Sequence, residues 1–140
     1  MSNRHCLLAA GIFGALGILM GAFGAHALDP LLAALDVPEG DFARRGEILE
    51  IGARYQIYHA VALLGLAALM DRRSNAWLSR AALLWVAGTV LFSGSLYGIV
   101  FAGINALGAI TPLGGLTLIA GWVLAGLAAV NGDGRNEDGI

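Results

Sequence analysis

One stretch of six residues, 54–59, brings several reactive groups together: Arg54, Tyr55, Gln56, Tyr58 and His59. These side chains supply a cation, two phenols, an amide and an imidazole. The apolar run that follows, residues 60–70, is typical of a membrane span. Polar side chains at the edge of hydrocarbon are costly unless they are paired or face protein or a wet cavity. We therefore expect the chain to pack around this segment.

Further polar residues are predicted at the same membrane depth, in the outer leaflet: His26, Ser93, Ser95, Tyr97 and Thr111. One interpretation is a hydrogen-bond network between helices, because Ser, Tyr, Gln and His bridge helices in bilayers. The alternative is a polar pocket that binds an ion, a proton or a small molecule, as in a permease. The network is favoured. We expect His59 to point into the bundle and to bond Ser93, Ser95 or Tyr97.

Enzymatic sites are minority interpretations of the same residues. His26 and His59 could ligate a haem from two sides if they face one another. A zinc or copper site would need more donors at that depth. Ser93 or Ser95 beside His59 could form a nucleophile–base pair, but the sequence has no G-x-S-x-G elbow. The prediction is no catalytic residue, no metal and no cofactor, with an enzyme left as the less favoured class.

Composition indicates a membrane protein. The chain has 140 residues, of which 58% are hydrophobic and only 13% charged. Such a balance is too apolar for an ordinary soluble domain. The net charge of −2 provides no basic field for nucleic acid. The single cysteine, Cys6, excludes an internal disulfide and a cysteine-based metal cluster.

The apolar runs predict one all-α domain over residues 1–140, an integral membrane bundle of four transmembrane helices. The expected spans are about 6–28, 51–70, 81–102 and 111–130. Residues 31–50 form a mixed interfacial loop, with helical patterning from Phe42 onward. Asp29-Pro30 is expected to end the first helix. Thr111-Pro112 is typical of a helix start, with Thr111 as the N-cap.

The first span carries glycines every three or four residues, which predicts a face that another helix approaches closely: Gly14, Gly17, Gly21 and Gly24. We expect Gly17 and Gly21 to be its centre. The sequence Ala25-His26-Ala27 resembles a signal cleavage site, but the apolar run before it is long for a signal peptide. We therefore expect the span to be retained.

Arginines predict the orientation. With four spans, one side of the membrane holds Arg4, Arg72, Arg73, Arg80 and Arg135. The other side holds Arg44, Arg45 and Arg54. The positive-inside rule then puts both termini in the cytoplasm and the turn at 103–110 outside.

Four ordered motifs also resemble a known family: GAFGAH at 21–26, YQIYHA at 55–60, LFSGSLY at 91–97 and ITPLGG at 110–115. They are similar to the small membrane proteins catalogued as domain of unknown function 423, to which transmembrane protein 256 is related. The resemblance implies a bacterial inner-membrane protein of about four helices, without an established activity. We expect a non-catalytic membrane module or accessory subunit, with the lipid bilayer and either a homo-oligomer or a larger membrane complex as partners.

Overall fold

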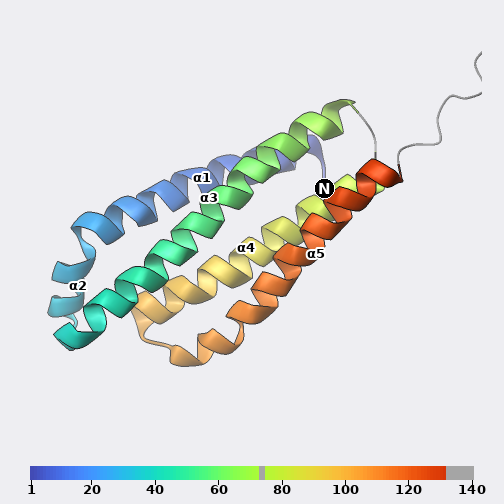
Figure 1. Ribbon diagram of the computed structural model, residues 1–140. Helices are drawn as coiled ribbons and strands as arrows, with labels where there is room; N and C mark the ends of the chain where they lie inside the picture. The colour runs from blue at the N-terminus through green and yellow to red at the C-terminus, as the bar shows by residue number, and fades with distance from the viewer. Residues whose placement is uncertain (73–74, 132–140) are drawn as a thin grey trace, which may run out of the picture.

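The chain is all-helical in the computed structural model, which describes residues 1–72 and 75–131. The helices are α1 (Asn3–His26), α2 (Leu28–Ala34), α3 (Phe42–Arg72), α4 (Ala76–Ala102) and α5 (Thr111–Val130), with 3-10 turns η1 (Glu39–Asp41) and η2 (Asn105–Ala109). The four long helices lie side by side (Figure 1). We call the end that carries α2, η1 and η2 the turn end, and the end near Met1 the terminal end. The predicted fold class is confirmed.

The long helices pack in chain order, so that α3 and α4 are central. The main packing pairs are α1 with α3, α3 with α4, and α4 with α5. One apolar cluster lies toward the terminal end and includes Cys6, Leu63 and Trp85. A second cluster, at the turn end, is formed by Leu28, Leu32, Leu49 and Val100. Both clusters join side chains from helices far apart in sequence, which makes the bundle one unit.

Three helical segments within the described residues are long and apolar enough to cross a membrane: Asn3–His26, Ala76–Ala102 and Asn105–Val130. The fourth long helix, α3, has 31 residues but carries the polar residues 54–59 in its middle. Large apolar side chains on α1 and α5 are exposed, among them Leu8, Ile18 and Leu116. Such side chains suit contact with lipid tails.

The helix ends differ from the expected ones at two places. First, α1 ends at His26, and Asp29-Pro30 lies in the first turn of α2. Proline is tolerated there because the N–H that it lacks would have no helical partner. Second, the N-cap of α5 is Ile110 and not Thr111. The Thr111 hydroxyl is engaged with Ser95 instead, so it does not cap the helix. The predicted helical start at Phe42 is confirmed.

Three of the four packing glycines face α3, and one does not. A Cβ atom added at Gly17 would lie 2.6 Å from Ile57 Cγ1, and one at Gly24 would lie 3.1 Å from Leu49 Cδ2. Gly14 is looser, at 3.9 Å from Ala60 Cβ. Gly21 was expected at the centre of this face, but it is exposed and a Cβ there would meet nothing within 4 Å. The contact seam follows the seven-residue step from Gly17 to Gly24, and Gly21 lies beside it.

Candidate functional site

Gln56 joins three helices through its side-chain amide. The Gln56 Nε2 group donates to the Phe13 carbonyl oxygen of α1 at 2.8 Å. The Tyr97 hydroxyl of α4 donates to Gln56 Oε1 at 3.0 Å. Gln56 is 4% exposed, so these bonds replace water in an interior that otherwise offers few partners. One amide on α3 therefore ties α1 and α4 together.

Two serines of α4 bond neighbouring helices. The Ser93 hydroxyl donates to the Gly52 carbonyl oxygen of α3 at 2.8 Å. Gly52 lacks a side chain, and the Tyr97 ring fills that space, since a Cβ on Gly52 would lie 2.8 Å from Tyr97 Cε1. The Ser95 and Thr111 hydroxyls share a 2.8 Å hydrogen bond, which links α4 to the start of α5. Both serines are buried.

His59 connects α3 to α5, but through a partner that the sequence did not suggest. Its Nδ1 lies 2.8 Å from the Tyr55 carbonyl oxygen, and the Trp122 Nε1–H group donates to its Nε2 at 3.2 Å. A carbonyl only accepts and an indole N–H only donates, so His59 carries its proton on Nδ1 and is neutral. His59 does point into the bundle, as expected. The expectation of Ser93, Ser95 or Tyr97 as partner was wrong, because those groups bond Gly52, Thr111 and Gln56.

Two tryptophans complete the surroundings of His59. The rings of Trp85 and Trp122 lie 4.5 Å apart between centroids, and each meets the imidazole edge-to-face at about 6 Å. Trp85 Nε1 and Thr89 Oγ1 are buried and have no hydrogen-bond partner within the described residues. Sequence analysis missed these three residues because they lie in uncharged spans. An indole N–H in mid-span needs a partner, and that requirement could have indicated the two tryptophans but not Thr89.

The remaining predicted site residues lie outside the network. His26, Arg54, Tyr55 and Tyr58 are exposed. Arg54 pairs with Glu50 one turn earlier on α3. The Tyr55 ring packs at 5.0 Å from the Phe92 ring of α4. The structure thus gathers Gln56, His59, Ser93, Ser95, Tyr97 and Thr111 between helices. It leaves the other four residues on the surface.

The two histidines proposed for haem ligation are far apart. His26 is the last residue of α1, next to Gly24, which packs on Leu49. His59 is ten residues beyond Leu49 on α3, a separation of about 15 Å along the helix axis. The assumption that they share one depth was wrong. Because both ring nitrogens of His59 are hydrogen-bonded and the Ser93 hydroxyl turns to Gly52, neither the haem nor the serine–histidine arrangement is formed.

Three cavities in the described part of the molecule lie away from the polar network. A groove of about 280 Å³ at the turn end is lined by Met20, Gly21, Gly24, Ala25, Gly46, Leu49 and Glu50. Another of about 280 Å³ at the terminal end is lined by apolar residues with Arg72 and Asn75. A pocket of about 50 Å³ lies beside Arg44, Arg45 and Asn105. None of these three is lined by Gln56, His59 or Ser93.

Comparison with known proteins places the chain in a family. Residues 20–115 match the model described as protein of unknown function, DUF423. The chain belongs to the DUF423 family. The UPF0382 inner membrane protein YgdD of Escherichia coli is 35% identical over 130 residues, which cover 93% of this chain and 92% of that protein. The UPF0382 membrane protein YwdK of Bacillus subtilis is 38% identical over 125 residues, 89% of this chain and 94% of that protein.

The similarity to YgdD and YwdK over most of the chain, together with the long apolar helices, makes this chain a multi-pass protein of the inner, or plasma, membrane. The UPF0382 membrane protein of Haemophilus influenzae, 33% identical over 123 residues, agrees with that location. No solved structure matches the chain. The names of these relatives state a membrane location and no activity, so the site geometry has to supply the functional argument.

Proposed function

We propose that this DUF423 protein is a non-catalytic membrane module whose polar cluster is a structural network between helices. The observation that carries the proposal is that the polar atoms of Gln56 and His59 are hydrogen-bonded to other groups of the protein. The Gln56 amide is hydrogen-bonded to α1 through its nitrogen and to α4 through its oxygen. Both ring nitrogens of His59 are hydrogen-bonded as well. His59 therefore has no ring nitrogen left for a ligand, and the remaining N–H and lone pair of Gln56 are closed to solvent because the side chain is only 4% exposed. The module acts as a homo-oligomer or as an accessory subunit of a larger membrane complex.

The proposal includes a topology of four membrane crossings. Helix α3 is the crossing additional to the three apolar helical segments, because its mid-length residues Gln56 and His59 are buried against α1, α4 and α5. Arg4, Arg72 and Arg80 lie at the terminal end, and the bias in the full sequence, five arginines on this side against three on the other, supports cytoplasmic termini. Arg73 and Arg135, which contribute to the same bias in sequence, lie outside the described residues. The turn end then faces away from the cytoplasm.

A pair of cysteine variants tests both parts. Each is made in a Cys6→Ala background, so that the new thiol is the only one. Asn105→Cys lies in the exposed turn η2, and Ser93→Cys lies in the network, where the native side chain is 1% exposed. In intact cells, an impermeant thiol reagent should label Asn105→Cys rapidly and Ser93→Cys hardly at all.

Two results would contradict the proposal. Labelling of Asn105→Cys only after lysis would reverse the topology. Labelling of Ser93→Cys as fast as Asn105→Cys, with the fold intact, would reveal a water-filled pocket. The ion, proton or small-molecule binder would then be the better function.

A further inference from the structure

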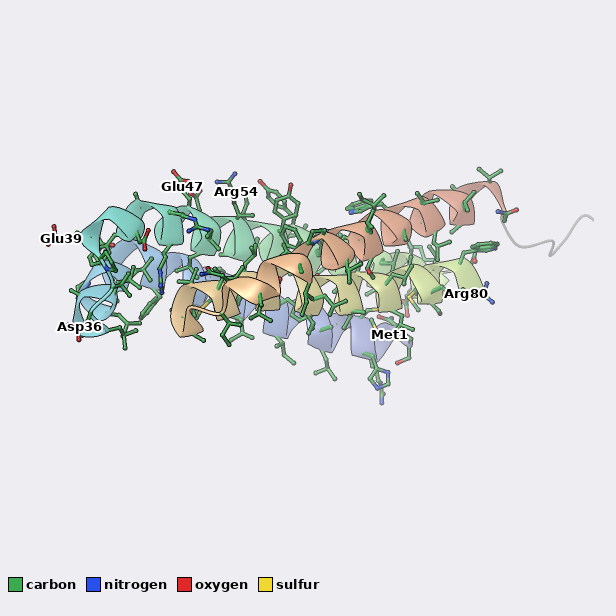
Figure 2. The ribbon with its side chains drawn as sticks, turned by 90° about the horizontal axis from the view of Figure 1, so that it is seen from below. Met1, Asp36, Glu39, Glu47, Arg54 and Arg80 are labelled. Carbon is green, nitrogen blue, oxygen red and sulfur yellow. The ribbon has the colours of Figure 1, made fainter. Side chains whose placement is uncertain are left out.

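The face of α3 that points away from the bundle carries an unusual pattern. Eight of the exposed residues of α3 recur at steps of three or four along the helix: Glu47, Glu50, Arg54, Tyr58, Val61, Gly65, Ala68 and Arg72. Figure 2 shows Glu47 and Arg54 projecting away from the other helices. We call these eight residues the outer seam. Alternating steps of three and four are the spacing by which one helix packs along another.

Two polar residues of the outer seam, Arg54 and Tyr58, lie deep in the bundle. Ala53, next to Arg54, has its carbonyl oxygen 3.3 Å from a Cβ built on Gly17, and Ala60 faces Gly14. Gly14 is twelve residues from the end of α1 at His26, about 18 Å by helical rise. Tyr58 is therefore near the middle of a hydrocarbon core of about 30 Å, and Arg54 is about a turn nearer to its edge. Charged and polar groups that face lipid at that depth are costly.

Pairing within one chain does not remove the difficulty. Arg54 and Glu50 neutralise each other, but their side chains remain 49% and 65% exposed. Glu47 and the Tyr58 ring are exposed on the same face. The polar side chains of the network are buried or half-buried against neighbouring helices. We infer that the outer seam is also covered by protein.

We propose that the outer seam binds the outer seam of a second copy of this chain, in a parallel two-fold dimer. This rests on the proposed membrane module and selects its homo-oligomeric form. Copies inserted in the same direction present the same residues at the same depth, as an isologous contact requires. Each Arg54 then lies opposite Arg54 of the second copy and about one helical turn from Glu50 of both copies, so the two carboxylates neutralise the two guanidinium groups.

The apolar half of the outer seam fits the same partner. A Cβ built on Gly65 would meet nothing within 4 Å in the single chain, so the surface there is open. Val61 and Ala68 flank it on the seam. Small residues let two helix backbones approach closely in a bilayer, where packing supplies much of the association energy. Close approach at Gly65 would bring the charged halves of both copies within reach of each other.

Disulfide trapping in native membranes tests the proposal, using Gly65→Cys in the Cys6→Ala background. The matched control is Gly126→Cys on α5, because Gly126 is also an exposed glycine with open space around it. The His59–Trp122 contact places the two glycines within about one turn of the same depth. Mild oxidation should convert most Gly65→Cys protein to a covalent dimer and leave Gly126→Cys monomeric. Equal trapping at both sites, no trapping at Gly65, or trapping to a different protein would overturn the proposal.

Charge reversal provides a second test that does not depend on cysteine geometry. One tagged copy carries Arg54→Glu and so has two acids at 50 and 54, and a differently tagged copy carries Glu50→Arg and has two cations. Each variant alone should lose most of its self-association, and the two together should co-purify at near the wild-type level. Self-association of either variant at the wild-type level would overturn the proposal. Failure here while Ser93→Cys stays unreactive would leave the proposed structural network intact.

Discussion

Helix α3 carries two polar faces with opposite environments: the inner face is buried against other helices, and the outer face is exposed. The inner face places Gln56 and His59 against α1, α4 and α5, where carbonyl, hydroxyl and indole groups satisfy them. The outer face holds Glu47 and the Arg54–Glu50 pair, whose two members are both on α3. The inner groups therefore contribute to the stability of one chain. The exposed outer pair contributes little to the stability of one chain.

The difference shows why polar content alone does not identify a site in a membrane helix. Polar residues on both faces lower the mean hydropathy of α3. The sequence pattern does not distinguish the residues of one face from those of the other. A buried amide with both ends bonded strengthens the bundle, because water does not compete for its partners. An exposed ion pair at the same depth leaves a surface that lipid covers poorly. The following variants separate the two faces, from the largest expected effect to the smallest.

Gln56→Leu should have the largest effect on the fold. It removes the donor to the Phe13 carbonyl and the acceptor of the Tyr97 hydroxyl, and an unsatisfied buried group costs about 1–3 kcal/mol. We expect a large loss of thermal stability of the purified protein in detergent. Tyr58→Phe, which removes one exposed hydroxyl on the outer face, is the control and should leave the melting temperature of the monomer unchanged. Equal melting temperatures for Gln56→Leu and Tyr58→Phe would mean that polar groups on the inner face of α3 stabilise the monomer no more than those on its outer face.

Gly17→Ala should be the next most destabilising change, because it forces α1 away from the inner face of α3. Its new methyl group would meet Ile57 and the Ala53 carbonyl, and overpacking costs about 1–3 kcal/mol. Gly21→Ala is the matched control. It adds a methyl into open space and should be neutral or stabilising by up to about 1 kcal/mol, since alanine favours helix. Denaturant titration in mixed micelles would compare the free energies of unfolding of the two variants. If Gly21→Ala were the more destabilising, the contact assigned between α1 and α3 would be wrong.

His59→Leu should destabilise the fold by stranding the Trp122 indole N–H, at a cost of about 1 kcal/mol. The cost stays at the low end because Trp122 is 52% exposed. His59→Gln should retain most of the stability, since an amide can both accept from Trp122 and donate to Tyr55. Tryptophan fluorescence would report both variants through the ring cluster at Trp85 and Trp122. Identical unfolding midpoints for Leu and Gln would mean that the hydrogen bond contributes nothing.

Ser93→Ala should have the smallest effect. Its hydroxyl donates to the Gly52 carbonyl, and hydrogen bonds between membrane helices average about 0.6 kcal/mol. We expect a shift in the unfolding midpoint close to the limit of measurement. Ser93→Val adds bulk at the same site and should destabilise more, because the side chain is fully buried. A loss with alanine as large as that of Gln56→Leu would indicate a more demanding role for Ser93.

Much of this protein follows from its sequence alone. The uncharged runs before His26 and after Arg80 predict long membrane helices, because hydrocarbon accepts only segments whose backbone bonds are internal. The motifs at 21–26, 55–60, 91–97 and 110–115 were sufficient to indicate the family. Residues 54–59 were identified as the segment around which the chain packs, and Gln56 and His59 are buried there. These features depend on composition and local periodicity, which a linear sequence carries in full.

Only the tertiary structure decided how each helix is rotated about its axis and which side chains meet. That rotation turns Arg54 and Tyr58 outward while Gln56 and His59, one or two residues away, turn inward. It also puts Gly21 beside the α1–α3 seam and brings Trp122 to His59, 63 residues apart in sequence. A helix rotates to the angle that best satisfies all its neighbours together. The pairing of His59 with an indole therefore follows from the packing of α4 between α3 and α5, which no local pattern encodes.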